Sequence, residues 1–262
     1  MKQFRASIVS NRPVSDDFHA IEFTWPSAAG IPAPGQFFTV RVSDGTVPFL
    51  RRPFAFSGFD GAGHIASAIY KRRGRGTEIL AAKKEGETLD VIGPSGNPFM
   101  LPAPNCTPVL AAGGIGLGPV LFLARVLHDA GRRAVFAAGF RTAMDIVDKT
   151  LFGQSAVTLC TDDGSEGFKG TTVDYIRQYL ERADSVSRTA MVMYACGPMA
   201  MLKGCHETAQ RFGVTCYVSV EQVMACGVGA CMGCVVKAAG GNGYVRVCSD
   251  GPVFNSRDIE WI

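Results

Sequence analysis

The sequence has little charge and contains no long run of one sign. Charged residues make up 19% of its 262 residues, below the roughly 25% of an average globular protein. The formal net charge is +3, and no block of lysines and arginines supplies the basic patch that nucleic-acid binding needs. We therefore expect no nucleic-acid partner, and a surface that is partly covered by cofactors or by another protein.

Long hydrophobic segments are also missing. The only membrane-like stretch, Val109–Ala124, contains four glycines and Pro119 and is shorter than the ~20 residues of a spanning helix. Met1–Ser10 has no apolar core of a secretory signal. We therefore expect no membrane association, no export and a cytoplasmic location.

Side-chain sets for hydrolysis or for a single catalytic metal ion are absent as well. The histidines have no partner at ligand spacing, and no Ser-His-Asp set stands out. We expect the chemistry to reside in bound cofactors, which the protein binds and orients. No residue is therefore predicted to be catalytic.

Glycine, by contrast, is frequent, with 31 residues against the usual ~7%. Turn signals separate six short β-favouring runs in the first hundred residues, which predict a small closed antiparallel barrel. One helix is expected from about Thr77 to Lys84, with Thr77 as its cap. The runs are Phe4–Val9, Ile21–Trp25, Phe37–Val42, Phe54–Phe56, His64–Tyr70 and Thr88–Ile92.

After the proline-rich segment Leu101–Pro108, strand-like and helix-like runs alternate, which predicts a doubly wound parallel sheet. Residues 225–262 follow neither pattern and are expected to hold at most a hairpin. The predicted domains are 1–101, 102–224 and 225–262. The strand-like runs are Val109–Ala112, Ala134–Gly139, Ala156–Thr161, Ala190–Ala195 and Thr215–Val220, and the helix-like runs are Pro119–Ala130, Val173–Arg182 and Pro198–Phe212.

Nine cysteines are present, and four of them lie close together near the end of the sequence. Their spacing, C-x4-C-x2-C followed by a distant fourth cysteine, is that of plant-type 2Fe-2S proteins, in which two thiolates hold each iron. The alternative is a four-cysteine zinc site, although zinc ligands more often come as two C-x2-C pairs. The expected ligands are Cys226, Cys231, Cys234 and Cys248.

Two glycine turns end strand-like runs and begin helix-like ones, at Gly113–Gly118 and at Cys196-Gly197-Pro198. Amides at such helix starts bind phosphate, and ligands of open α/β sheets bind at this edge. Because the glycines do not follow the GxGxxG order, tight packing turns remain the alternative.

Two motifs in the expected barrel are suited to a pyrophosphate. Arg51-Arg52-Pro53-Phe54 places a cation beside an aromatic ring, and Gly74-Arg75-Gly76-Thr77 opens a helix. From the residues alone, a solvated arginine pair and an ordinary capped helix remain open.

Taken together, these motifs resemble the electron-transfer subunits of NAD-linked dihydroorotate dehydrogenase B, in the ferredoxin reductase superfamily, over essentially the whole chain. The resemblance implies FAD on the barrel, NAD at the α/β domain and a 2Fe-2S cluster in the tail. It also implies a heterotetramer of two plus two with an FMN-containing catalytic subunit. Electrons would pass from FMN through the cluster and FAD to NAD+ in pyrimidine biosynthesis. The matching segments are Pro34–Phe37, Arg51–Pro53, Gly74–Thr77, Gly93–Asn97, Gly113–Gly116, Thr161–Gly164, Cys196–Pro198, Glu221–Cys234 and Cys248–Phe254.

The resemblance also implies roles for individual residues. In this superfamily a Ser or Thr hydroxyl usually reaches the flavin N5 edge, but Ala55 stands at that position, and Ser57 is the next hydroxyl on the same strand face. The expected FAD-binding residues are Arg52, Pro53, Phe54, Ala55, Ile69, Tyr70, Lys71, Gly76 and Thr77. The expected NAD-binding residues are Gly113, Gly114, Gly116, Cys196 and Gly197. The apolar end, Val253-Phe254 through Trp261-Ile262, is expected to form a surface that the partner covers.

Two other functions fit the residues. One is a flavin iron–sulfur NAD(P)H reductase component that serves a different acceptor. The segment after Cys234 is, however, too short for the ferredoxin domain that oxygenase reductases of this kind carry. The other is a zinc-stapled, non-enzymatic nucleotide-binding module.

Overall fold

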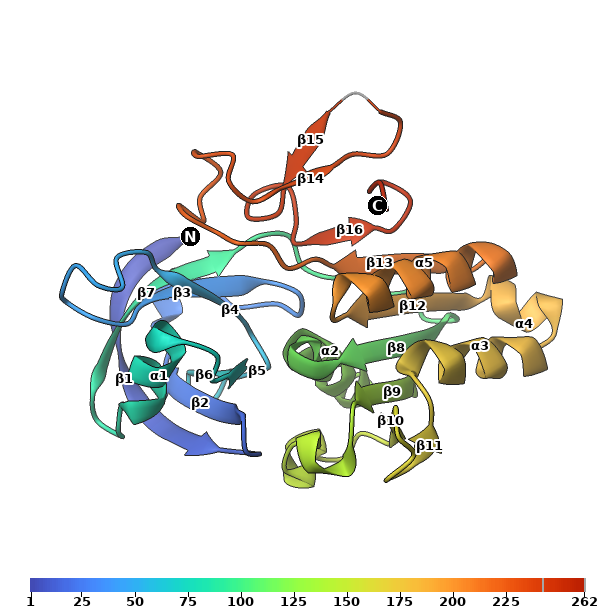
Figure 1. Ribbon diagram of the computed structural model, residues 1–262, viewed down its shortest axis with the longest axis horizontal. Helices are drawn as coiled ribbons and strands as arrows, with labels where there is room; N and C mark the ends of the chain where they lie inside the picture. Colours follow the sequence, from blue (N-terminus) through green and yellow to red (C-terminus); the bar gives the residue numbers. More distant parts are fainter. Residues whose placement is uncertain (242, 262) are drawn as a thin grey trace.

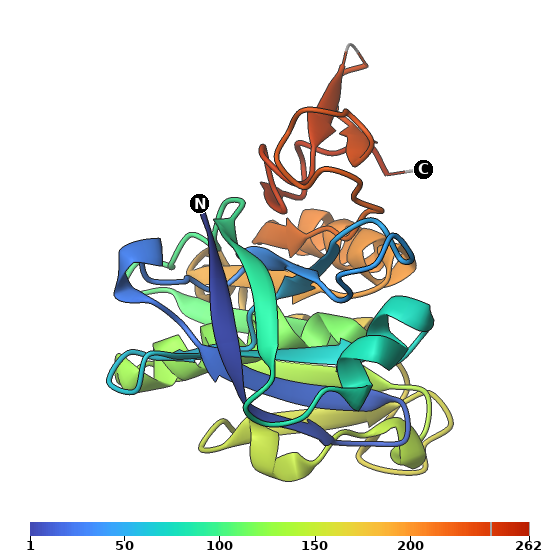
Figure 2. The ribbon, with the colours of Figure 1, turned by 90° about the vertical axis from the view of Figure 1, so that its left-hand side faces the viewer.

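A β-barrel and an α/β unit lie side by side, and the C-terminal segment stands at one end of the molecule above both (Figure 1). Figure 2, turned by 90°, shows the same arrangement, with the C-terminal segment in red rising away from the rest. The computed structural model describes residues 1–241 and 243–261. None of the helices in these residues combines the length and the apolar character that crossing a bilayer requires.

The N-terminal barrel is a single antiparallel ladder in the order β4-β3-β7-β1-β2-β6-β5. Its two end strands, β4 and β5, are consecutive in the chain and are separated only by Phe56 and Ser57. The chain itself therefore closes the barrel between β3 and β6. The elements are β1 (Lys2–Pro13), β2 (Phe18–Thr24), η1 (Ser27–Ala29), β3 (Phe37–Arg41), β4 (Arg52–Ala55), β5 (Gly58–Asp60), β6 (Ile65–Lys71), α1 (Arg75–Ala82) and β7 (Thr88–Ser95).

The barrel strands follow the alternation of buried and exposed side chains. In β1, Ala6 and Ile8 are buried and their neighbours are exposed or partly exposed, and β7 shows the same period of two. The inward side chains form a core rich in aromatic rings, including Trp25, Phe38 and Phe56. The antiparallel barrel expected from the sequence is confirmed, with β4 and β5 as two halves of one bent strand.

The expected cap of α1 is wrong. Gly74 is the N-cap, and Thr77 is the third residue of the helix. The Thr77 hydroxyl instead accepts hydrogen bonds from the amides of Arg73 and Gly74, at 2.9 and 3.2 Å. The Thr77 side chain, in the first turn of α1, thus stabilises the backbone turn that precedes the helix.

The second unit is a sheet in the order β11-β10-β9-β8-β12-β13-β16. Chain order runs outward in both directions from β8 and β12, so the topological switch point lies between these two strands. The elements are β8 (Thr107–Gly113), η2 (Gly114–Gly116), α2 (Leu117–Asp129), β9 (Val135–Phe140), η3 (Ala143–Asp145), η4 (Lys149–Phe152), β10 (Val157–Thr161), β11 (Phe168–Lys169), α3 (Thr172–Arg182), α4 (Ser185–Thr189), β12 (Met191–Cys196), α5 (Met199–Phe212) and β13 (Thr215–Ser219).

Helices cover both faces of this sheet. On one face, Val109 and Ala111 of β8 pack with buried residues of α3 and α5. On the other face, Leu110 and Ala112 pack with α2, which lies toward the barrel. The buried strands are apolar on both sides, as expected for a parallel sheet between helices. The doubly wound sheet expected from the sequence is confirmed.

The C-terminal segment contains β14 (Val235–Lys237), β15 (Tyr244–Arg246) and β16 (Val253–Asn255). The first two strands form the expected hairpin. The third was not expected, and it pairs antiparallel with β13 at the edge of the large sheet. Val253 and Phe254 are each 8% exposed. The expectation that these two residues form a surface for a partner is wrong, because they are buried within the chain.

Candidate functional site

A cavity of about 400 Å³ opens between the barrel and the carboxyl edge of the sheet. We call it the interdomain pocket. The barrel contributes the ends of β4 and β6, and the sheet contributes the residues that follow β8, β12 and β13. Its wall includes Pro53, Phe54, Ala55, Ile69, Tyr70, Lys71, Gly114, Cys196, Ser219 and Glu221.

The pocket exists because β4 and β6 diverge. β5 pairs with β6 only as far as Gly58 opposite Ser67. In the described residues, no strand pairs with the edge of β6 that continues from Ala68 to Lys71 on the side away from β2. The rings of Phe54 and Tyr70 lie across this gap, with their centroids 5.6 Å apart. The pocket therefore offers aromatic rings beside backbone donors and acceptors, which suits a flat, polar-edged ring system.

The structure divides the expected FAD-binding residues into two groups. Pro53, Phe54, Ala55, Ile69, Tyr70 and Lys71 line the interdomain pocket. Arg52, Gly76 and Thr77 lie outside its wall, where the arginine packs on the first turn of α1. A Cβ atom on Gly76 would lie 2.7 Å from Nε of Arg52. The neighbouring Arg51 binds the Asp90 carboxylate at 2.9 Å, so only one arginine of the pair is next to the helix start.

The two expected glycine turns meet at the switch point of the sheet. A Cβ atom on Gly116 would lie 2.1 Å from the carbonyl oxygen of Cys196. Neither Gly116 nor Gly197 lines the wall of the interdomain pocket. The absence of a side chain at these two positions lets the two turns approach each other. Gly113 and Gly114 line a second cavity of about 300 Å³ together with Gly139, Arg141, Asp145, Asp162, Thr172 and Met201. We call it the sheet-edge pocket.

Sequence reasoning missed Ser219 and Glu221 as residues of the interdomain pocket. Ser219 lies opposite Cys196 in the β12–β13 ladder. Burial raises the pKa of the Cys196 thiol, so this thiol is neutral at physiological pH. Glu221 is exposed to the open pocket, yet the surrounding protein desolvates its carboxyl and raises its pKa. Ser219 is the last residue of β13 and Glu221 lies two residues beyond it, and only the approach of barrel and sheet brings them to the pocket.

The structure also locates the hydroxyl groups around Ala55. Ser57 is buried and its Oγ lies 3.2 Å from Oγ of Ser67, outside the wall of the interdomain pocket. The hydroxyl that lines this pocket is that of Ser219, from the other unit. Ser57 is therefore not placed to replace the hydroxyl that Ala55 lacks.

The four expected ligand cysteines lie in two turns of the C-terminal segment, residues 226–234 and residues 246–250. We call them the cysteine loop and the Cys248 turn. Backbone amides point at the sulfur atoms: those of Val228 and Gly229 lie 3.4 and 3.1 Å from Sγ of Cys226 and Cys248. Gly227 and Gly229 adopt φ values of 68° and 83°, which glycine reaches without strain. The backbone is thus folded to present amides to sulfur.

These amides and the surroundings change the acidity of the thiols. Hydrogen bonds, first from the Val228 amide and then from neighbouring amides and the Cys231 thiol, lower the pKa of Cys226 to about 6. Burial raises the pKa of Cys248 to about 11. Cys231 is exposed, whereas Cys234 and Cys248 are buried. One end of the four-sulfur group therefore faces solvent and the other faces the protein.

The four cysteines are neighbours of one another. The Cys248 amide donates to Sγ of Cys234 at 3.4 Å, Cys231 contributes to the lowered pKa of Cys226, and both Cys234 and Cys226 contribute to the raised pKa of Cys248. In residues 1–241 and 243–261, no three Cys, His, Asp or Glu side chains converge in the way a single metal ion requires. A two-iron cluster takes two thiolates at each iron. The donor set and its amides therefore fit a 2Fe-2S cluster.

Comparison with known sequences agrees with this geometry. Residues 221–260 match the family model of the iron-sulfur cluster binding domain of dihydroorotate dehydrogenase B. Over 98% of both chains, the sequence is 33% identical to the dihydroorotate dehydrogenase B (NAD(+)) electron transfer subunit of Caldanaerobacter subterraneus. It is 35% identical to the same subunit of Bacillus velezensis over 99% of both chains.

Solved structures show the same architecture. The NADH-dependent reduced ferredoxin-NADP oxidoreductase aligns with a TM-score of 0.83 and 29% identity, over 98% of this chain and 90% of that one. Phthalate dioxygenase reductase aligns with a TM-score of 0.63 and 23% identity, over 80% of this chain and 65% of that one, and it supports the fold alone. The first alignment includes the C-terminal segment, because it spans nearly the whole chain.

Proposed function

Because the chain belongs to the family of dihydroorotate dehydrogenase B electron transfer subunits, we propose that it carries electrons between a dihydroorotate-oxidising subunit and NAD+. The observation that carries this proposal is the presence, in one chain, of a four-thiol loop with amides aimed at its sulfurs and of a pocket shared by barrel and sheet. Such a chain has one site for an iron–sulfur cluster and another for a flavin that a nucleotide can approach.

The cofactors supply the redox chemistry. When bound, the cluster exchanges single electrons with FAD, and FAD exchanges a hydride with NAD. The protein holds these groups in order and keeps water from the reacting atoms.

We assign the flavin ring to the interdomain pocket. Phe54 and Tyr70 supply aromatic contacts, and the free edge of β6 from Ile69 to Lys71 supplies backbone hydrogen bonds. Arg52 and the amides near Gly76 and Thr77 neutralise the pyrophosphate. Because Ala55 cannot donate a hydrogen bond, Ser219 is the hydroxyl that faces the flavin from the sheet.

We assign NAD to the carboxyl edge of the sheet. Gly113 and Gly114 form the turn on which the pyrophosphate lies, and Gly116 and Gly197 permit the two turns to approach. Cys196 lines the interdomain pocket, where its neutral thiol is a polarisable neighbour of the nicotinamide. The adenosine half then occupies the sheet-edge pocket beside Arg141 and Asp162.

The third assignment concerns the cluster and the assembly. Cys226, Cys231, Cys234 and Cys248 hold one 2Fe-2S cluster, and the exposed Cys231 end faces the partner. The partner is an FMN-containing catalytic subunit, and the assembly has two copies of each chain, located in the cytoplasm. The three functional segments are 1–101 for FAD, 102–224 for NAD and 225–262 for the cluster.

A reductase component for a different acceptor is the second candidate. It is favoured by the alignment, over nearly the whole chain, with an oxidoreductase of ferredoxin and NADP, and by the absence of a hydroxyl at Ala55. The zinc-stapled module has less support, because residues 221–260 match the family model of an iron-sulfur cluster binding domain.

The experiment that tests the proposal is anaerobic purification followed by reconstitution. The chain alone should contain one FAD and two irons with two sulfides, and it should reduce dyes with NADH. It should oxidise dihydroorotate with NAD+ only when co-expressed with the FMN subunit. Stoichiometric zinc without sulfide would exclude the cluster. Failure to associate at micromolar concentration in light scattering would show that the partner is a different one.

A further inference from the structure

Two sets of hydrogen bonds, one from the backbone and one from side chains, join the two ends of the Cys248 turn. We call this junction the neck of the turn. The Arg246 carbonyl accepts hydrogen bonds from the amides of Asp250 and Gly251, at 2.8 and 3.2 Å. The side chains of Arg246 and Asp250 close the same neck: Nε and Nη2 of the arginine donate to the two carboxylate oxygens at 3.0 and 2.9 Å. The Arg246 amide adds a third contact to the carboxylate at 2.8 Å. Cys248 is the central residue of the turn that these contacts hold shut.

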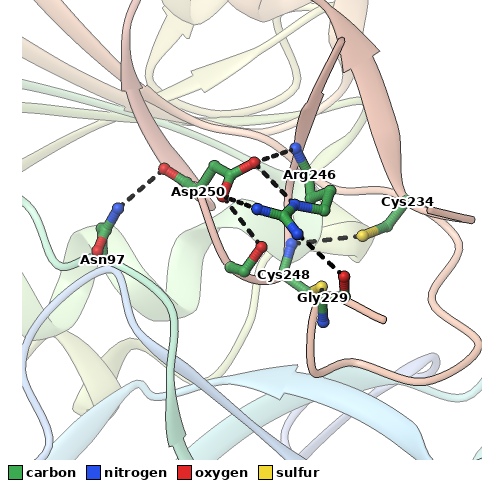
Figure 3. A network of polar contacts seen from close by, with 7 residues as sticks. Asn97, Gly229, Cys234, Arg246, Cys248 and Asp250 are labelled. Atoms are coloured by element: carbon green, nitrogen blue, oxygen red, sulfur yellow. Dashed lines mark hydrogen bonds and ion pairs between the residues drawn. The ribbon is translucent and has the colours of Figure 1, made fainter. Parts of the chain in front are cut away.

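The same arginine reaches across to the cysteine loop. Its Nη1 donates to the carbonyl oxygen of Gly229 at 3.1 Å, and the amide of Gly229 points at Sγ of Cys248 at 3.1 Å (Figure 3). The Cys248 amide in turn donates to Sγ of Cys234 at 3.4 Å. Gly229 is thus held on both sides of its Cα atom: its carbonyl oxygen binds a guanidinium, and its amide, in the preceding peptide unit, points at a ligand sulfur. By holding the carbonyl, the guanidinium restrains the backbone at the residue that presents this amide to the cluster site.

The turn is also tied to the barrel. The carbonyl oxygen of Asp250 accepts a hydrogen bond from Nδ2 of Asn97, just after β7, at 2.8 Å (Figure 3). The Asn97 amide donates to the next carbonyl, that of Gly251. A Cβ atom on Gly96 would lie 2.4 Å from Pro252, so the two segments are in close contact. A further hydrogen bond joins Gln36 to Gly96, which carries the connection to β3 beside the interdomain pocket.

From these contacts we propose that Arg246 and Asp250 are positioning residues of the iron–sulfur site. The pair holds Cys248 and the Gly229 amide in their ligating arrangement, and it fixes that arrangement against the flavin barrel through Asn97. The proposal rests on the assignment of the cluster to the four cysteines. The geometry exceeds that of a simple surface ion pair, because one guanidinium bridges a carboxylate and a carbonyl from two different turns.

The test uses the holoprotein and measures the cluster directly. In Arg246→Gln and in Asp250→Asn, the neck loses its side-chain closure. We expect the visible absorbance of the cluster to decay at least tenfold faster than in the unmodified protein when EDTA is added in air. The EPR spectrum of the reduced cluster should broaden or shift its g values. FAD content should stay unchanged, because neither residue lines the interdomain pocket.

Two further variants separate positioning from charge pairing. Arg246→Lys keeps the charge but cannot bridge Asp250 and Gly229, and it should give an intermediate decay rate. The exchanged pair Arg246→Asp with Asp250→Arg restores the opposite charges but removes the contact to Gly229. It should therefore regain thermal stability without regaining the EPR signature. Full recovery of the signature in the exchanged pair would reduce the role of Arg246 to that of an ion pair.

The matched control is Glu260→Gln. Lys237 and Glu260 form an ion pair in the same segment at 2.8 Å, with side-chain exposures of 37% and 38% against 37% and 33% for Arg246 and Asp250. In the described residues, this ion pair makes no hydrogen bond to the cysteine loop. If Arg246→Gln lost its FAD as well, the decay rates of the cluster in Asp250→Asn and Arg246→Lys would test the proposal in its place. Decay rates equal to that of Glu260→Gln would overturn the inference. An unmodified protein without iron and sulfide would instead overturn the proposed function.

Discussion

The interdomain pocket and the cysteine loop, the two proposed cofactor sites, are built in opposite ways. The pocket is formed by the ends of β4, β6, β12 and β13, whose strands are anchored in large apolar cores. The cysteine loop has no strand of its own, and it keeps its shape through amide–sulfur contacts and through the polar bonds of the Cys248 turn. The interdomain pocket results from the packing of the two units, whereas the shape of the cysteine loop depends on bonds that a bound cluster would complete.

The difference bears on which parts fold without their cofactors. Strands buried between helices keep their geometry whether or not the pocket is filled, because burial of apolar surface stabilises them. A loop held by metal–thiolate bonds gains much of its folding free energy from the metal. The comparison therefore predicts that loss of the cluster leaves the flavin site intact.

The largest effect is expected for Cys248→Ala, which removes one of the four proposed ligands from a buried position. The cluster should be lost completely while FAD stays at one equivalent, as measured by iron, sulfide and flavin analysis with EPR. Cys106→Ser is the control, since this half-exposed thiol lies outside the C-terminal segment. Parallel loss of FAD in Cys248→Ala would show that the two sites fold as one unit and would end the comparison.

A smaller but still large effect is expected for Gly116→Ala. The new methyl group would lie 2.1 Å from the Cys196 carbonyl oxygen, so the two turns must separate. We expect a loss of about 3 kcal/mol in unfolding free energy, with NADH binding weakened roughly tenfold, or about 1.4 kcal/mol. Denaturant unfolding and NADH titration measure the two effects.

Gly118→Ala is the matched control, two residues further on, in the first turn of α2, whose N-cap is Gly116. Its added Cβ atom would lie 3.6 Å from Ser57, an ordinary contact, so stability and NADH affinity should be kept. Equal behaviour of the two variants would mean that the approach of the turns does not set the nucleotide site.

The third prediction concerns the phosphate end of the flavin. Arg52→Ala should weaken FAD retention by about 2 kcal/mol, or roughly thirtyfold, because one charge-assisted contact is lost. Fluorescence titration of the flavin-free protein with FAD measures the change. Arg51→Ala should leave FAD affinity unaltered, since Arg51 binds Asp90. If the two variants weakened FAD equally, general charge and not position would be responsible.

The smallest effect is a pH dependence of stability at Glu221. Desolvation raises the pKa of this carboxyl in the folded state, so ionisation is less favourable in the fold than in the unfolded chain. In flavin-free protein, Glu221→Gln should therefore melt at a slightly higher temperature than the unmodified chain at neutral pH. The difference should disappear below about pH 4, where both states are protonated.

The charged neighbours of Glu221 in the same pocket are Lys71 and Arg73, and the Cys196 thiol is neutral. Desolvation is the one cause of the raised pKa of Glu221, and neither cation offsets it. A melting-temperature difference that stays constant from pH 4 to pH 8 would contradict the assignment to Glu221.

Much of the fold could be predicted because it follows from periodicity. The period of two in β1 and β7 and the change to alternating strands and helices after Leu101 each reflect a local pattern. The cysteine spacing likewise points to a cluster without any tertiary information. Such features could be read from residues that lie near one another in the sequence.

The rest depends on contacts between distant segments. β16 has only three residues, and nothing in Val253–Asn255 shows that it will pair with β13. Ser219 and Glu221 reach the interdomain pocket only because the sheet docks against the barrel. Arg246 and Asp250 have the spacing of any local ion pair, and the contact to Gly229 that sets them apart joins two turns. No one-dimensional pattern contains this information.

The pairing of β13 with β16 has a consequence for how such chains diversify. Ser219 and Val253 are opposite one another in the ladder, so the chain leaves the sheet and returns to it at neighbouring points. Residues 220–252 are therefore an insertion between two strands that a short turn could join directly. The length of such a segment can change without altering the register of β13 and β16. Its contacts with Asn97 and with the interdomain pocket, by contrast, tie it to the barrel and to the sheet, so a change in its sequence must preserve these contacts.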